Sequence, residues 1–153
     1  MRKLLLISGA LVGFALITGS VTQGSPALTS PGTVRITSLD VKISLLNRGS
    51  RSRGTGDVLL IRQLLFNKGI RKEAIGHADL VCTYTGPKNR QCNGTYSLPR
   101  GTLVVSGSVR FRDFFRLAVV GGTEIYDNVR GSLTATKYTR RPRREILIFR
   151  LVV

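Results

Sequence analysis

The chain has 153 residues and a formal net charge of +16, and this length allows one domain with a substantial core. So basic a protein is drawn toward polyanions. Its two arginine-rich segments, residues 48–53 and 140–144, lack the interleaved aromatic side chains that stack on bases. We therefore expect loose adhesion to anionic glycans or cell surfaces rather than specific nucleic-acid recognition. The alternative is that the charge only keeps the protein soluble.

The N-terminus has the layout of a secretory signal peptide. Arg2 and Lys3 precede an apolar stretch over residues 4–17, and small and polar residues follow. The stretch is shorter than the roughly twenty residues of a membrane span, and no later segment is apolar enough to be one. We expect residues 1–24 to be removed, residues 25–32 to form a flexible arm, and residues 33–153 to form a secreted domain, extracellular or periplasmic.

From Thr33 onward, short runs of β-branched and apolar residues are separated by turn residues, which predicts an all-β domain. Residues 59–66 have some helical character, but their glycine-rich flanks favour a strand. The expected strands are residues 34–46, 57–67, 74–84, 91–97, 102–109, 114–120, 131–139 and 145–153. Eight antiparallel strands with short connections predict an up-and-down β-barrel, because closure removes exposed strand edges.

Cys82 and Cys92 are the only cysteines, and both lie in the part expected to be exported. An oxidising compartment favours a disulfide, and the spacing suits a hairpin with its turn at residues 86–89. The alternatives are a metal or redox site. No Cys-x-x-Cys is present and the chain has one histidine, so a common zinc set cannot be completed. We expect no metal and a structural disulfide.

The last expected strand is apolar on both faces, because Ile146 and Ile148 alternate with Leu147 and Phe149. A barrel filled inside and wet outside should alternate apolar with polar residues. The outer apolar face needs a cover, and a second copy of the chain is the simplest one. We therefore expect a homo-oligomer; the alternative is that the arm or the loops cover this face.

An apolar run over residues 117–120 stops at a glycine pair, and glycine there predicts a turn or bulge. The segment resembles the Gly-Gly-Thr-Gly-x-Tyr/Phe-x-x-Ala-Arg-Gly motif of plant dirigent proteins and allene oxide cyclases. The matching residues are Gly121, Gly122, Thr123, Tyr126, Arg130 and Gly131. Glu124 stands where the family usually has glycine, and Val129 where it has alanine. The family's acidic residues find no complete match.

The resemblance implies a trimeric barrel that holds a small hydrophobic or aromatic molecule and needs no cofactor. Such a barrel steers cyclisation, isomerisation or stereoselective coupling mainly by excluding water and aligning reacting atoms. On this model Arg130 binds a carboxylate or a developing negative charge, and Tyr126 donates a hydrogen bond. The alternatives are a rim arginine bound to strand-end carbonyls and a core-filling aromatic ring.

Other candidate acid–base groups are few. His77 is the one histidine, and Asp79 alternates with it on one strand face, where it could orient the imidazole. Asp57 and Asp113 lie near strand ends, where a barrel mouth would be. The alternative for all of these is an ordinary solvated side chain. Residues 54–56 lack the remainder of a phosphate-binding loop, and no nucleophile-elbow motif is present, so nucleotide binding and hydrolysis find no support.

Three functions remain open: a ligand-binding barrel with possible catalysis, a non-catalytic basic scaffold barrel, and a toxin or immunity-type interaction protein. The lining of the barrel discriminates between the first two. A roomy apolar cavity with Arg130 or Asp57 at its mouth favours ligand chemistry. An interior filled by side chains favours the scaffold.

Overall fold

The structure, a computed structural model, describes residues 32–49, 54–67, 73–110 and 113–152. The expected signal peptide at residues 1–24 and residues 25–31 of the expected arm lie outside the described residues. So do residues 50–53, which belong to one of the two arginine-rich segments. Within the described ranges, no helix has the length and hydropathy needed to cross a membrane.

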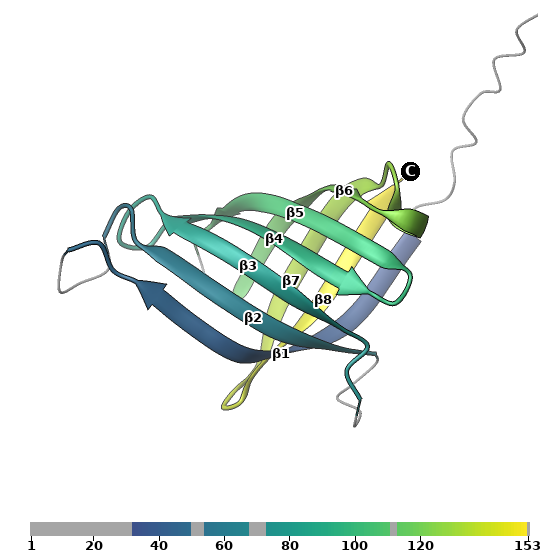
Figure 1. The fold of residues 1–153 in the computed structure, drawn as a ribbon, viewed down its shortest axis with the longest axis horizontal. Helices are drawn as coiled ribbons and strands as arrows, with labels where there is room; N and C mark the ends of the chain where they lie inside the picture. The colour runs from purple at the N-terminus through teal and green to yellow at the C-terminus, as the bar shows by residue number, and fades with distance from the viewer. Residues whose placement is uncertain (1–31, 50–53, 68–72, 111–112, 153) are drawn as a thin grey trace, which may run out of the picture.

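The described chain forms a closed antiparallel barrel in which each strand pairs with its neighbours in sequence and β1 pairs with β8 (Figure 1). Its strands are β1 (Gly32–Leu46), β2 (Val58–Asn67), β3 (Gly76–Tyr84), β4 (Arg90–Leu98), β5 (Gly101–Val109), β6 (Phe114–Gly122), β7 (Arg130–Arg140) and β8 (Arg143–Val152). A short 3-10 helix, η1 (Glu124–Tyr126), connects β6 to β7. The predicted eight-stranded barrel is confirmed, including a strand rather than a helix at residues 59–66.

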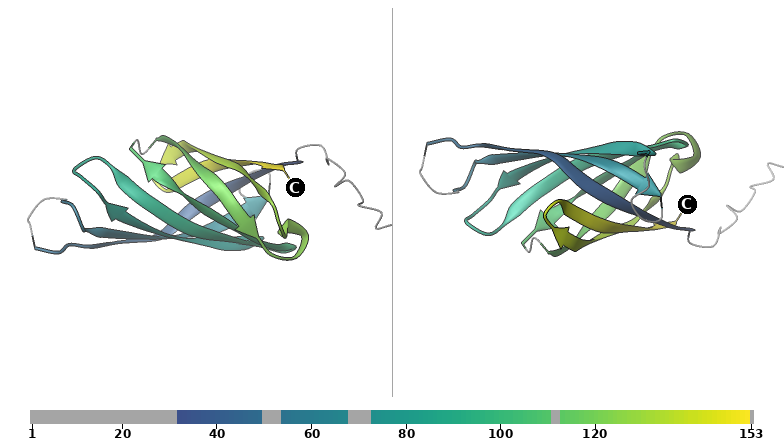
Figure 2. Two further views of the ribbon diagram at one scale, coloured as in Figure 1. Left: turned by 90° about the horizontal axis from the view of Figure 1, so that it is seen from above. Right: turned by 90° about the horizontal axis from the view of Figure 1, so that it is seen from below.

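The barrel has two distinct ends. At one end, which we call the helix end, η1 lies close to the start of β1 and the last residues of β8 (Figure 1). At the opposite end, the hairpin end, the chain turns from β1 to β2, β3 to β4, β5 to β6 and β7 to β8. The paired ends of β1 and β2 reach farther than the β7–β8 hairpin (Figure 2).

Alternation along each strand sends one set of side chains into the barrel. In β8, Leu147 and Phe149 are fully buried, whereas Ile146 and Ile148 are half-buried on the outer face. The ring of Phe149 packs edge-on against Tyr96 of β4, with ring centroids 5.2 Å apart. Along most of the barrel axis, the interior is therefore a packed hydrophobic core.

β1 extends beyond the start of β8. β1 pairs with β8 only over residues 32–39, and residues 40–46 pair with β2 alone. A bulge between Asp40 and Lys42 changes the phase of alternation, so Ile43 and Leu45 lie opposite the buried Ile61 and Leu59. Ile43 is nevertheless 50% exposed. An apolar stretch of the inner wall thus reaches solvent at the hairpin end.

The predicted Cys82–Cys92 disulfide is confirmed. The two cysteines face each other across β3 and β4, and both are buried. The bond closes the hairpin that contains residues 85–89, as the spacing predicted.

The glycines of the motif occupy two different environments. Gly121 lies beside a β-bulge, because the register between β5 and β6 shifts after Val104 and leaves Val120 as an extra residue. A Cβ on Gly121 would meet no atom within 4 Å. Gly131 has φ +146°, and a Cβ there would collide with the carbonyl oxygen of Arg150 on β8. Of the three glycines in the motif, only Gly131 is required by both backbone conformation and space.

We predict that Gly131→Ala destabilises the barrel by about 1–3 kcal/mol, because the new methyl group is strained and pushes β8 away from β7. The matched variant Gly121→Ala should change the free energy of unfolding by less than about 1 kcal/mol. Urea unfolding of both variants measures this. Equal losses at the two positions would contradict the assignment.

Reduction of the disulfide should lower the free energy of unfolding by roughly 2–3 kcal/mol, because the unfolded chain regains the entropy of an open loop. The check is the thermal midpoint with and without dithiothreitol. The double variant Cys82→Ala/Cys92→Ala is the control and should not respond to the reductant. A wild-type midpoint that is equally insensitive would contradict the prediction.

Candidate functional site

A cluster of polar side chains lies inside the barrel, where β1, β2 and β8 meet. Barrel closure places Ser38 opposite Glu145, and the β1–β2 register places Asp40 opposite Gln63. We call Ser38, Asp40, Gln63, Tyr96, Arg143 and Glu145 the interior polar cluster. The side chains of Asp40 and Glu145 are each only 3% exposed.

Gln63 joins the two carboxylates. Its Nε2 donates to Asp40 Oδ1 at 2.6 Å and to Glu145 Oε2 at 3.2 Å. Arg143 binds the same pair from β8: its Nη2 donates to Glu145 Oε1 at 2.7 Å, and its Nε lies 3.1 Å from Asp40 Oδ2. Two buried acids therefore share one amide and one guanidinium.

The environment favours the neutral forms of two groups in this cluster, Asp40 and Tyr96. Burial raises the pKa of Asp40 and the nearby charge of Glu145 adds to this, although the Gln63 hydrogen bond and the Arg143 charge oppose it. Burial also raises the pKa of the Tyr96 hydroxyl, and the charges of Glu145 and Asp40 act in the same direction. Asp40 is thus suited to donate a proton within the barrel, whereas Tyr96 stays neutral and can donate a hydrogen bond.

Several polar atoms of the interior have no hydrogen-bond partner in the described part of the chain. They include Ser38 Oγ, Gln63 Oε1, the Tyr84 and Tyr96 hydroxyls and Arg90 Nε. Buried polar groups are normally hydrogen-bonded, so this concentration calls for a water molecule or a ligand. A cavity of about 10 Å³ lies among Gln63, Arg90, Arg143 and Glu145, which is space for about one water-sized group.

The residues expected from the motif lie elsewhere. Arg130 is exposed and its Nη1 donates to the carbonyl oxygen of Val120 at 3.2 Å, which matches the rim-arginine alternative. Tyr126 packs partly buried against the core at the helix end and lines a hollow of about 340 Å³. Thr123 Oγ1 accepts from the backbone N–H of Thr102 at 3.1 Å, so it fastens the β6–η1 turn.

The remaining acid–base candidates are also separate from the cluster. Asp57 is buried, but it accepts the backbone N–H groups of Arg48 and Gly54, each at 2.9 Å, and these bonds lower its pKa. His77 is exposed, and Asp79 binds Arg62 at 2.7 Å.

Asp113 is exposed at the hairpin end, where its carboxylate binds Lys137 at 2.6 Å. The structure therefore brings none of Arg130, Tyr126, Asp57 and His77 to the interior polar cluster. Among the described residues, no group of three or more His, Cys, Asp or Glu side chains is placed to hold a metal ion.

Sequence reasoning missed Asp40, Gln63 and Glu145. One signal was available: Glu145 alternates with Leu147 and Phe149, so it belongs to the inward set of the last strand. Gln63 likewise interrupts the inward set of β2. A polar residue in an otherwise apolar inward set is a sign of a site within a barrel.

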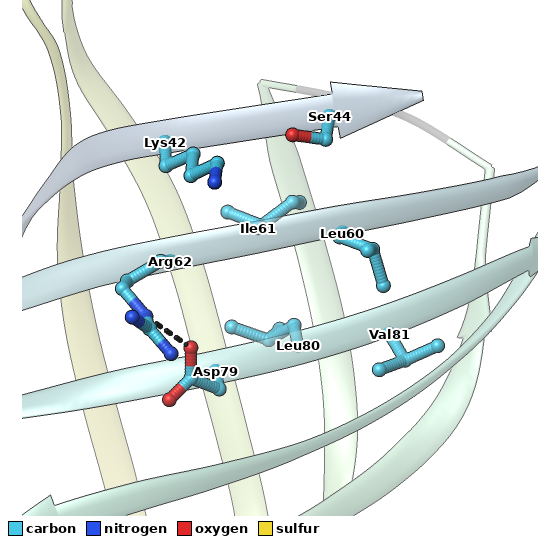
Figure 3. A pocket seen from close by; sticks show the side chains of 8 residues that line it. All are labelled: Lys42, Ser44, Leu60, Ile61, Arg62, Asp79, Leu80 and Val81. Atoms are coloured by element: carbon cyan, nitrogen blue, oxygen red, sulfur yellow. Dashed lines mark hydrogen bonds and ion pairs between the residues drawn. The ribbon is translucent and has the colours of Figure 1, made fainter. Parts of the chain in front are cut away.

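A second hollow lies on the outer face of β1–β3 and measures about 380 Å³ (Figure 3). Leu60 and Val81 form its apolar part, and Lys42 with the Arg62–Asp79 ion pair borders it. Val81 is 47% exposed. The sequence predicted a cover for the outer face of β8, where Ile146 and Ile148 are half-buried; the outer face of β1–β3 also has exposed apolar side chains.

Comparison of the structure with solved structures places the fold. A pyocyanin demethylase superposes with a TM-score of 0.68 at 20% identity, over 78% of this chain and 99% of that one. A pterocarpan synthase dirigent protein gives 0.64 at 16% identity, over 90% and 98%. A Diels–Alderase from Streptomyces koyangensis gives 0.61 at 15% identity, over 77% and 63%.

Sequence comparison adds little to this. No protein family matches the chain as a whole or in part. A small ribosomal subunit protein uS2 from Nitrosopumilus maritimus is 43% identical over 72 residues, which is 46% of this chain. The chain spans about a third of that relative's length, 35%. What the comparisons establish is the fold: this chain has the barrel that dirigent proteins and cyclase enzymes share, as the motif predicted.

The raised pKa of Asp40 predicts a pH dependence of stability. The folded state prefers the neutral acid, so the wild type loses stability as pH rises from about 4 through the folded pKa. Asp40→Asn cannot lose this contribution, and its stability relative to wild type should increase over that window. Urea unfolding at several pH values measures the difference.

Asp113→Asn is a control with the opposite sign. The hydrogen bond from Lys137 lowers the pKa of Asp113, so the wild type gains stability as pH rises toward about 4. Asp113→Asn should therefore lose stability relative to wild type over that rise. A gap between Asp40→Asn and wild type that does not change with pH would contradict the assignment.

Proposed function

We propose that the barrel binds a small hydrophobic or aromatic molecule and steers its cyclisation or isomerisation by proton transfer at Asp40 and Glu145. The observation that carries this is the buried acid pair bridged by Gln63. In general acid–base catalysis, two carboxyl groups in different environments often serve as the acid and the base. The names of two solved neighbours, a pterocarpan synthase dirigent protein and a Diels–Alderase, are consistent with ring formation in this fold.

The proposed step balances without a further reactant. The Asp40 carboxyl donates a proton to one atom of the substrate, and the Glu145 carboxylate removes a proton from another. The Tyr96 hydroxyl, which has no partner among the described residues, can donate a hydrogen bond to charge that develops on the substrate. Return of a proton from Glu145 to Asp40 after the product leaves resets the pair, while the Gln63 amide holds both carboxyl groups in position.

A specific observation supports a second candidate, the non-catalytic basic scaffold. Among the described residues, the cavity beside the acid pair is water-sized, and neither Arg130 nor Asp57 lines it. By the criterion set from the sequence, this favours the scaffold. We rank it second because a scaffold role does not explain the buried acid pair or the polar atoms beside it that have no partner among the described residues.

We also propose the setting in which the barrel works. The outer face of β1–β3 suits contact with another copy of the chain, in a homo-oligomer and by family resemblance a trimer. A signal peptide at residues 1–24 would export the protein, and the disulfide is compatible with that destination. The strong positive charge would then hold it at anionic surfaces.

Native mass spectrometry of protein purified from its source is the first test, and we expect a co-purified small molecule. NMR would then follow conversion of that molecule or its precursor by the wild type. Asp40→Asn and Glu145→Gln should lower the rate by about 10²–10⁴-fold, the usual contribution of general acid–base catalysis. Asp79→Asn, which removes a carboxylate on the outer face, should leave the rate unchanged.

The scaffold hypothesis predicts the opposite results. It would be supported by the absence of any bound small molecule together with salt-reversible binding to heparin. That pair of results would overturn the catalytic proposal.

A further inference from the structure

Arg90, at the start of β4, is a buried cation without an identified counter-ion. It is 5% exposed, and its Nε has no hydrogen-bond partner among the described residues. None of the ion pairs in this part of the chain includes it. Burying a guanidinium without an anion is strongly unfavourable, so Arg90 has an electrostatic cost in this position.

The neighbours of Arg90 do not remove that cost. Glu145 lines the same cavity, but its carboxylate is bound by Arg143 and Gln63. Tyr84 lies directly opposite Arg90 across β3 and β4, and its buried hydroxyl has no partner in the described chain. The positive charge of Arg143 is shared with Glu145 and Asp40. Of the two arginines that line this cavity, Arg90 is the one with no carboxylate bound to it among the described residues.

An apolar surface leads from this point to solvent. Ile61 lines the cavity together with Arg90, and its cross-strand partner is the half-exposed Ile43. Leu59 and Leu45 form the next pair on the same inner wall. β8 does not pair with this part of β1, and Ile43 and Leu45 are partly exposed there, whereas their partners Ile61 and Leu59 are buried beneath them. The site therefore joins a buried cation to an accessible apolar wall.

We propose that the ligand of this barrel is a small amphipathic anion, an organic acid whose anionic group binds Arg90 while its apolar body lies on the inner wall of β1 and β2. The proposal rests on the proposed function and names its substrate class. The cavity has room for about one oxygen atom of that group, to which a guanidinium N–H can donate, and both carboxylate and sulfonate oxygens accept such a bond. The unpartnered Tyr84 hydroxyl can donate to the same group.

The first test measures stability without ligand. Arg90→Met keeps a side chain of similar length and removes the charge. The midpoint of thermal unfolding, measured without added ligand, should therefore rise. Arg150→Met, at an exposed position on the outer face of β8, is the control and should leave it nearly unchanged. A fall in the midpoint of Arg90→Met would show that the cation is satisfied within the protein and would overturn the proposal.

The second test compares two fluorescent probes with the same ring system, 8-anilinonaphthalene-1-sulfonate and the uncharged N-phenyl-1-naphthylamine. In about 0.15 M salt, which screens surface charges, wild type should bind the sulfonate more tightly. Arg90→Gln should weaken sulfonate binding by about tenfold or more and change binding of the neutral probe by less than about twofold. Arg150→Gln should change neither by more than that.

Each outcome is decisive. Equal affinities for the two probes, or equal losses for both in Arg90→Gln, would overturn the anion site and leave the proposed function standing. Failure of the wild type to bind either probe would overturn the anion site and the ligand-binding barrel together.

Discussion

The pairing of the first strand with the last one is the constraint on which this molecule depends. It closes the barrel, and the same register brings Ser38 and Asp40 of β1 to Glu145 and Arg143 of β8. These residues come from opposite ends of the described chain, so the interior polar cluster cannot exist before closure. Gly131 on β7 lets β8 lie close enough to pair, since a side chain at this position would displace β8. Fold and site are therefore specified together.

The interior combines close apolar packing, which favours stability, with buried polar groups, which reduce it. Most of the barrel is filled by close-packed side chains, including the Tyr96–Phe149 ring pair, and this supplies stability. The same interior buries the Asp40 and Glu145 carboxyl groups, Arg90 and several polar atoms without a partner among the described residues, all of which cost stability. On our proposal these costs are offset when a ligand supplies the missing partners. The buried disulfide cross-links β3 to β4 two residues from Arg90.

Much of the fold was predictable from local pattern, whereas the site was not. Alternation and turn residues located all eight strands to within two residues, because a strand's period is a local property. The site depends on register between distant strands and on a bulge between Asp40 and Lys42, which reverses the direction of every later side chain in β1. Neither can be derived from one strand alone. The motif around Gly121 and Arg130 indicated the correct fold, but in this chain it forms a bulge, a turn and a rim contact.

The central claim is that a small molecule occupies the barrel beside the acid pair. A high-resolution crystal structure of protein purified from its source tests it most directly. The account predicts density for a non-protein group within hydrogen-bonding distance of Arg90 and of the Tyr96 or Glu145 side chain, with an apolar part against Ile61. An interior that holds only water, with density confined to the outer groove of β1–β3, would contradict it.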